Sequence, residues 1–282
     1  MRDVAGKVAV ITGGASGIGR GMAEAFAAAG MKLVIADVDE ARAVETARAL
    51  EASGAKAIAV RTDVSKPAEV EALAQRALDA FGAVHVVCNN AGVAYGGLPT
   101  WQSTVEDWTW IVGVNLMGVV HGVRTFTPLL IEQGEGHIVN TASVAGLITV
   151  GGNALYAVTK HAVVALSESL WNELAAAARG VHVSVLCPGF INTDLIRTSQ
   201  RNAPAAVRQQ HPDLFDGADA RQMQALLANA MSPAKVGDAV LSAIREQRFW
   251  ILPSPELAPA VRHRCENVIE ERDPTAHNPA RG

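Results

Sequence analysis

The residues that could most clearly take part in catalysis are a tyrosine and a lysine four positions apart, Tyr156 and Lys160. The surrounding residues are typical of a helix, and side chains at i and i+4 of a helix lie on one face. A free tyrosine has a pKa near ~10, and a cation held beside it favours the phenolate and lowers that pKa. The pair therefore predicts a proton donor and acceptor that works near neutral pH. The same spacing also occurs by chance on solvated helices, so the rest of the chain must decide.

A glycine-rich turn near the N-terminus predicts a nucleotide site. A buried strand over 8–12 runs into Thr-Gly-Gly-Ala-Ser-Gly-Ile-Gly at 12–19, and a helix follows. Glycines let the backbone approach a pyrophosphate, and a helix N-terminus offers N–H donors and a positive dipole. The glycine spacing differs from the plain GxGxxG fingerprint, and such a turn can be a simple connector. The next strand ends at Asp37, near the spacing of a ribose-binding carboxylate. The two signals together favour a dinucleotide.

Asp37 also bears on which dinucleotide binds. A carboxylate there accepts hydrogen bonds from the adenosine ribose and repels a 2′-phosphate. Neither Ser16 nor Val38 is basic, which favours NAD, whereas Arg42 one helical turn away leaves NADP open.

Short β-branched runs alternate with longer Ala-rich stretches along the chain. Continuous apolar strands between helices predict a doubly wound, Rossmann-type parallel sheet with helices on both faces. Ligands of such sheets bind at the carboxyl ends of the strands. The predicted strands are 8–12, 32–36, 57–61, 84–88, 136–141, 181–186 and 249–252. The predicted helices are 18–30, 40–53, 65–81 with Ser65 as N-cap, a helix from a capping box at 103–106 to about 126, and 155–179.

Composition narrows the class of protein. The chain has 282 residues, of which 49% are hydrophobic and 18% charged, as in a well-buried α/β protein. A net charge of -4 gives no reason to expect nucleic acid or an anionic membrane as partner. Three widely spaced cysteines predict a reducing cytoplasm, without disulfides or a metal site. The N-terminus is unlike a signal peptide, and no apolar run of about 18 residues predicts a membrane span.

Two segments depart from the alternating pattern. Residues 190–235 are rich in Gln, Asn, Asp and Pro, which predicts a substrate lid or, equally, a variable surface excursion. Beyond Pro253, apolar residues at helical spacing predict a terminal amphipathic helix, and 273–282 are expected to fray. We therefore expect a single domain over 1–252 that includes the lid, followed by a C-terminal helix and tail over 253–282.

The motifs, taken in order, resemble the classical short-chain dehydrogenases/reductases across roughly residues 4 to 252. The matching segments are the glycine turn at 12–19, Asp63-Val64, Asn89-Asn90-Ala91-Gly92, Asn115, Ser143 thirteen residues before Tyr156, Pro188-Gly189 and Thr193.

The resemblance implies hydride transfer between nicotinamide C4 and a carbonyl or alcohol carbon. It implies that Tyr156 exchanges the hydroxyl proton, while Lys160 lowers its pKa and binds the nicotinamide ribose. Ser143 would hydrogen-bond the substrate oxygen, and Asn115 would hold a water that links Lys160 to solvent. The implied cofactor contacts are Gly13, Ser16, Gly17, Ile18, Gly19, Asp37, Asp63, Val64, Asn90, Ala91, Gly92, Tyr156, Lys160, Pro188, Gly189 and Thr193.

The expected substrate pocket is apolar. It should be lined by Val93, Ala94 and Tyr95, by 144–152 and by the lid, with no Arg or Lys near Ser143. This predicts an uncharged secondary alcohol or ketone, such as a terpenoid, steroid or aliphatic carbinol. The family also implies a homotetramer, or a homodimer, built through the helices that hold Asn115 and Tyr156.

Three other functions stay open: a non-catalytic dinucleotide sensor on the same fold, an NADP-linked carbonyl reductase, and an epimerase or dehydratase. Sensors usually lose the tyrosine or the lysine, and epimerases are usually longer chains. The other Trp, His and Cys residues that could have a function are predicted to be structural, because they pack in or near the core. They are Trp101, Trp108, Trp110, His121, His161, Cys88 and Cys187.

Overall fold

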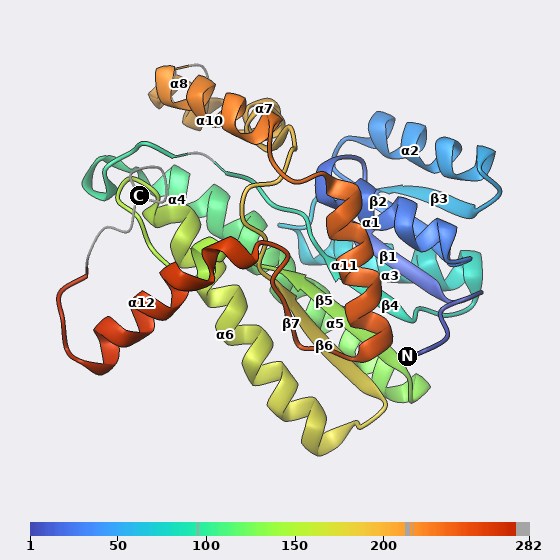
Figure 1. Cartoon of the computed structure of the whole chain (residues 1–282). Coiled ribbons are helices and arrows are strands. Elements are labelled where there is room, and N and C mark those ends of the chain that lie inside the picture. Colours follow the sequence, from blue (N-terminus) through green and yellow to red (C-terminus); the bar gives the residue numbers. More distant parts are fainter. Residues whose placement is uncertain (95, 212–214, 216, 275–282) are drawn as a thin grey trace.

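A parallel sheet forms the centre of the protein, whose computed structural model describes residues 1–94, 96–211, 215 and 217–274 (Figure 1). Its strand order is β3-β2-β1-β4-β5-β6-β7, and every neighbouring pair is parallel. The predicted doubly wound fold is thereby confirmed. The strands are β1 (Val8–Thr12), β2 (Lys32–Asp37), β3 (Lys56–Arg61), β4 (Val86–Asn89), β5 (Gly136–Thr141), β6 (Val181–Leu186) and β7 (Trp250–Ile251).

Helices cover both faces of the sheet. One face carries α1 (Gly17–Ala28), α2 (Glu40–Ala52) and α11 (Pro233–Glu246). The other carries α3 (Pro67–Phe81), α5 (Gly118–Gln133) and α6 (Ala154–Ala177). Along β1, Ala9 and Ile11 join the first core, while Val8 and Val10 join the second. Because successive strand residues face opposite sides, burial on both faces explains why these strands are apolar throughout.

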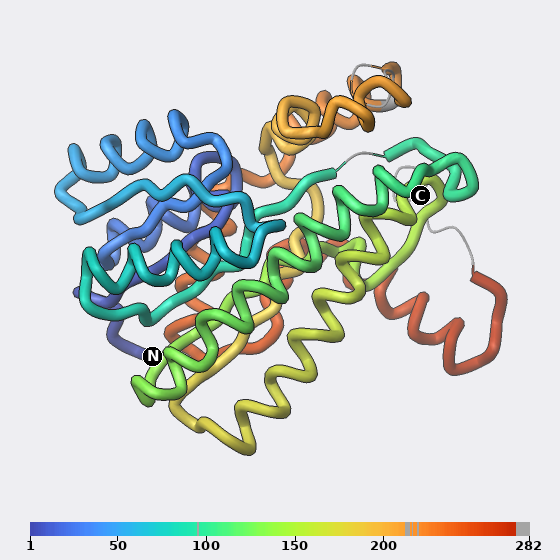
Figure 2. Tube along the Cα trace, turned by 180° about the vertical axis from the view of Figure 1, so that it is seen from behind, coloured from blue at the N-terminus to red at the C-terminus, as the bar shows by residue number. Residues whose placement is uncertain are grey.

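A long continuous helix runs beside α6 (Figure 2). It consists of α4 (Val105–Val112), the π-helical turn η2 (Gly113–Met117) and α5, and it ends at Gly134 in the left-handed region. Among the described residues this run alone is long and apolar enough to cross a membrane, judged by length and composition. A helix packed on a sheet passes the same test, and α5 contacts β4 and β5.

Two predicted helix starts are wrong by one or two residues. Ser65 is not an N-cap, because α3 begins at Pro67, whose fixed φ suits the first helical position. Ser65 instead donates its hydroxyl to Asp63 Oδ1 at 2.7 Å. The capping box is formed by Thr104 and Asp107, one residue later than predicted.

The lid segment, three single turns and a C-terminal helix lie outside the sheet and its covering helices in the described part of the chain. The lid segment contains α7 (Leu195–Asn202), α8 (Ala205–Gln210) and α10 (Ala218–Ala228), which lie above the carboxyl ends of the strands in Figure 1. Single turns η1 (Thr100–Gln102), η3 (Val144–Gly146) and η4 (Pro255–Leu257) connect other elements.

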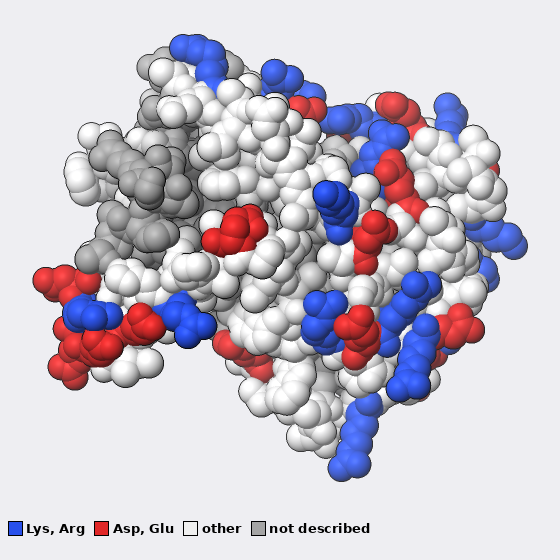
Figure 3. Space-filling view, viewed as in Figure 1, with Lys and Arg blue, Asp and Glu red and all other residues white. Residues whose placement is uncertain are grey.

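The predicted terminal helix forms as α12 (Ala258–Ile269), and it projects from the body. Ala260 near its beginning and Asn267 near its end are buried, whereas Val268 is 68% exposed. Residues 275–282, most of the segment expected to fray, lie outside the described residues. On the face shown in Figure 3, positive and negative side chains are interspersed rather than gathered by sign.

Candidate active site

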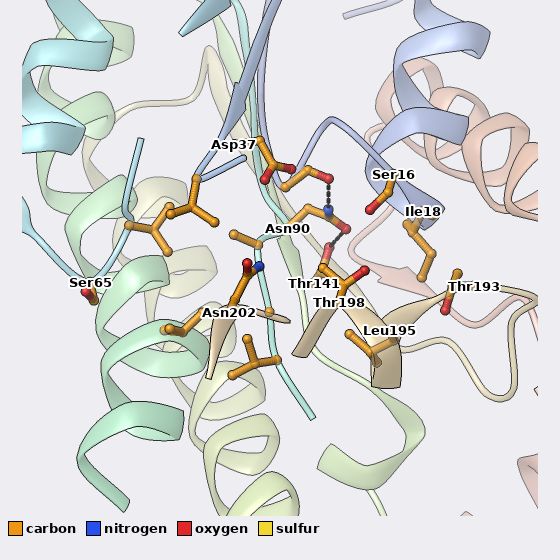
Figure 4. A pocket seen from close by; sticks show the side chains of 18 of the residues that line it. Ser16, Ile18, Asp37, Ser65, Asn90, Thr141, Thr193, Leu195, Thr198 and Asn202 are labelled. Atoms are coloured by element: carbon orange, nitrogen blue, oxygen red, sulfur yellow. Dashed lines mark hydrogen bonds between the residues drawn. The ribbon is translucent and has the colours of Figure 1, made fainter. Parts of the chain in front are cut away.

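A cleft of about 370 Å³ lies at the carboxyl ends of the strands, where the strand order reverses between β1 and β4 (Figure 4). Most of the predicted cofactor contacts line this cleft. They are Gly13, Ser16, Gly17, Ile18, Asp37, Asp63, Val64, Asn90, Ala91, Gly92, Tyr156, Lys160, Pro188 and Thr193.

Gly19 and Gly189 are not among the lining residues that the structure describes. Both lie behind the lining residues and allow neighbouring segments to pack closely. A Cβ on Gly19 would lie 2.1 Å from Gly13 O, so only glycine lets α1 start against the turn. A Cβ on Gly189 would lie 2.6 Å from Leu257, at the C-terminal segment. Both positions shape the cleft through close packing.

The glycine turn and the loop after β4 form one cradle. A Cβ on Gly13 would lie 2.9 Å from Ala91 Cα, so this glycine brings the two motifs together. Asn90 Nδ2 donates to Thr12 O at 3.0 Å. Thr141 Oγ1 donates to Asn90 Oδ1 at 3.2 Å, and Figure 4 draws this second bond. Three strand ends are thereby fixed around a space that fits a pyrophosphate.

Asp37 lines the cleft at the end of β2, away from Tyr156 and Lys160. Its carboxylate accepts backbone N–H groups of Ala15 at 3.2 Å and Asp39 at 3.1 Å. Burial raises the pKa of Asp37, and these two hydrogen bonds oppose the rise. The nearby wall is held by His121, whose Nδ1 lies 2.9 Å from Val64 O.

Tyr156 and Lys160 do lie together, with Lys160 Nζ 5.5 Å from the centroid of the tyrosine ring. Lys160 Nζ donates to Thr141 O at 2.9 Å, and burial lowers the pKa of Lys160 to about 8. Burial raises the pKa of Tyr156, although a hydrogen bond with Ser143 opposes this. The expected lowering of the tyrosine pKa is therefore wrong for this structure, because desolvation outweighs the favourable interactions.

Ser143 lies at the end of β5, where it caps η3. Its Oγ accepts the N–H of Ala145 at 3.1 Å and donates to Pro188 O at 3.4 Å. Only 6% of Ser143 is exposed. The serine is hydrogen-bonded to Tyr156, although it is not among the described residues that line the cleft. Its role in holding the substrate oxygen stays a prediction.

Asn115 is fully buried inside the π-helical turn. Its side chain accepts from Val93 N at 2.8 Å and donates to Val93 O at 2.9 Å and to Thr159 Oγ1 at 3.3 Å. It therefore joins the loop after β4 to α6, and π turns are frequent at functional sites. Its role in holding a water stays a prediction.

Sequence reasoning missed part of the cleft wall. Trp110 lines the cleft with Val114, one helical turn later, and this i, i+4 spacing just before Asn115 was the available signal. The lid contributes Thr198, Asn202 and Pro204. Trp101, expected to pack, is 85% exposed, because it lies on the short turn η1.

The predicted substrate wall is only partly present. Val93 lines the cleft, and Tyr95 lies outside the described residues. Val144 and Leu147 line a second cavity of about 380 Å³ instead, together with Cys187 and the start of α12. Burial raises the pKa of the Cys187 thiol to about 12, as expected of an inert cysteine.

Comparison with known proteins decides the family. A sequence profile described as short chain dehydrogenase matches residues 7–204. The chain belongs to the short-chain dehydrogenase family. The resemblance seen in the motifs is confirmed, and the protein is thereby placed among oxidoreductases.

Relatives extend this likeness over nearly the whole chain. A short-chain dehydrogenase/reductase from Burkholderia phymatum, solved in complex with NAD, is 46% identical and covers 98% of both chains, with a TM-score of 0.93. The 1-deoxy-11-beta-hydroxypentalenate dehydrogenase of Streptomyces exfoliatus is 41% identical over 93% of this chain and 88% of its own. The CLA biosynthesis dehydrogenase/reductase of Lactiplantibacillus plantarum is 33% identical over 98% of each chain.

Proposed function

We propose that this short-chain dehydrogenase is NAD-dependent and interconverts an uncharged, apolar secondary alcohol and its ketone. The observation that carries the proposal is one cleft lined by Asp37, Tyr156 and Lys160, in which Ser143 is hydrogen-bonded to Tyr156. The glycine cradle between them suits a dinucleotide.

The chain's own residues account for the proton and for orientation, while the nicotinamide would supply or accept the hydride. Burial keeps Tyr156 protonated at rest, so its hydroxyl can donate to a developing alkoxide during reduction. In oxidation the tyrosine must first lose its proton, and the phenolate oxygen then accepts the proton of the alcohol. Ser143 Oγ holds the substrate oxygen, and Lys160, with a pKa near 8, can exchange a proton close to neutral pH.

The preference for NAD rests on Asp37. A half-buried carboxylate beside the adenosine ribose accepts its hydroxyls and repels a 2′-phosphate. The NAD in the Burkholderia phymatum relative supports this assignment. The competing assignment, an NADP-linked carbonyl reductase, would need Arg42 to outweigh Asp37.

Cofactor preference is tested by steady-state kinetics with NAD and NADP on one substrate. We expect kcat/KM to favour NAD by about tenfold or more, the value of one charge-assisted hydrogen bond. Asp37→Ala should remove most of that preference, and the exposed-site variant Glu40→Ala should keep it. Equal use of both cofactors by the unmodified protein would contradict the NAD assignment.

The substrate class rests on the lining near Tyr156. Val93, Ala142 and Leu195 are apolar, and Asp194 is acidic. Lys160 is the only Lys or Arg lining the cleft in the part of the chain that the structure describes. Such a wall favours neutral molecules over anions.

A matched panel of alcohols, followed by NADH absorbance, tests this class. It should pair each apolar secondary alcohol with a carboxylated analogue of the same size, because the Streptomyces exfoliatus relative is named for a hydroxylated carboxylate. We expect turnover mainly of the neutral member. Turnover confined to the carboxylates would overturn the substrate class, and binding of NAD without turnover of any alcohol would favour the sensor.

We also propose assembly into a homotetramer or homodimer through the faces of α5 and α6. Val158 and Trp171 on α6 are 51% and 48% exposed, and Ile131 on α5 is 42% exposed. Large apolar side chains on neighbouring helices are typical of subunit interfaces. Light scattering on the purified protein tests this, and a monomer at micromolar concentration would contradict it.

A further inference from the structure

The lid shares a small apolar core with the body of the protein beside the cleft. This lid cluster consists of Val93, Leu98, Ile111, Leu155, Ala203, Val207 and Phe215. Its members are at most 7% exposed, and three of them belong to the lid. Trp110 and Tyr156 pack against the cluster. The apolar residues that support the ring of Tyr156 therefore include residues of the lid, which contact the ring's surroundings only when the lid packs on the body.

Two hydrogen bonds between described residues, one buried and one partly buried, attach the lid to the body. Ser199 Oγ, on α7, accepts the N–H of Ala94 at 2.8 Å, and Ser199 is fully buried. At the end of α8, His211 Nε2 donates to Asp107 Oδ2 at 3.0 Å. The side chain of Asp107 has no exposed surface, and that of His211 is 15% exposed.

Asp107 is more buried than its local task requires. As the third residue of the capping box, its carboxylate accepts the N–H of Thr104 at 2.8 Å, a task that an exposed carboxylate does equally well. Here α8 covers the carboxylate, and His211 supplies a donor in the place of water. A buried carboxylate without its donors is unfavourable, so the pair ties the position of α8 to α4.

We propose that His211 is a positioning residue, whose bond to Asp107 seats the lid cluster and thereby fixes the ring of Tyr156. The kinetic part of this inference rests on the proposed function, but the seating of the lid does not. The bond needs a hydrogen on Nε2, and a glutamine amide can supply a comparable donor.

Limited trypsin digestion tests the seating without any turnover. Arg201 and Arg208 lie in the lid with exposed side chains, so cleavage there reports lid opening. His211→Ala should speed this cleavage about tenfold, the loss expected for a hydrogen bond to a charged group. His211→Gln should restore most of the protection, and Gln210→Ala, an exposed neighbour, should digest like the unmodified protein.

The pair is isolated by a double-mutant cycle. On an Asp107→Ala background, His211→Ala should add no further cleavage, because its partner is already gone. Thr104→Ala weakens the capping box and leaves the lid contact in place, so it should lower thermal stability without opening the lid.

The positioning role is read from kinetics on the best substrate. His211→Ala should lower kcat/KM about tenfold. His211→Gln should recover most of it, and Gln210→Ala should change nothing.

Cleavage of His211→Ala at the unmodified rate overturns the seating of the lid. Faster cleavage with unchanged kcat/KM overturns the link to Tyr156, and an equal effect of His211→Ala on the Asp107→Ala background overturns the pairing.

Discussion

The two ends of the sheet both bury titratable side chains, yet they use them differently. At the amino end of β5, His137 is fully buried, with Nε2 2.7 Å from Ser184 Oγ, and Ser184 donates to Arg248 O at 2.6 Å. Burial lowers the pKa of His137 to about 3. At the carboxyl end, burial lowers the pKa of Lys160 to about 8 and raises that of Tyr156.

A perturbed pKa does not by itself mark the active site. The pKa of His137 is shifted further than that of Lys160, but its ring lies against Ser184 and lines neither of the two cavities described above. Lys160 and Tyr156 line a cleft that also has a glycine cradle, and Tyr156 is hydrogen-bonded to Ser143. What distinguishes the carboxyl end is a perturbed group that faces space for a ligand.

The largest expected effect belongs to the carboxyl end, in Tyr156→Phe. Removing the hydroxyl removes the proton donor and acceptor, so kcat should fall by about a thousandfold. Binding of NAD, measured by fluorescence titration, should stay largely intact, because the ring and its packing against the lid cluster remain. Retained turnover would remove Tyr156 from its role and end the contrast between the two ends of the sheet.

Lys160→Met should have the next largest effect, lowering kcat/KM by about a hundredfold and weakening NAD binding. Alcohol oxidation needs the phenolate form of Tyr156, so its rate should rise with pH. Loss of a cation 5.5 Å from the ring disfavours the phenolate, so that rise should move to higher pH in the variant. The apparent value belongs to the coupled pair, which the pH dependence of kcat/KM measures. An unshifted profile would separate Lys160 from the proton transfer.

What the sequence revealed depends on how local each constraint is. The glycine turn, Asp37 and the Tyr156–Lys160 spacing were readable because backbone geometry over a few residues requires them. Thr104 and Asp107 were misjudged by one position, since Ser103 and Glu106 offer the same cap chemistry and only the fold selects between them.

The less readable features depend on contacts between distant segments. The direction of the tyrosine pKa is set by burial, which no local spacing records. The bond between His211 and Asp107 joins residues 104 positions apart, and the polar composition of the lid hides it. Trp110 lies between these cases, because its helical spacing from Val114 was visible but the cleft beside it was not.

The smallest expected effect tests the amino end, where His137 should matter for stability in acid and not for turnover. Its folded pKa, about 3, lies below the unfolded value near 6.5, so the unfolded chain binds the proton first as pH falls. Stability is therefore lost from about pH 6.5 downward in the unmodified protein. His137→Gln keeps a partner for Ser184 but does not titrate, so it should lose about 1 kcal/mol less stability between pH 7 and pH 5.5. Urea unfolding at the two pH values, followed by circular dichroism, measures this difference within each protein, so any packing defect of the variant cancels. An equal loss in both proteins would show that His137 is not the group that titrates, and a lower kcat in the variant at pH 7 would show that the amino end is coupled to the site after all.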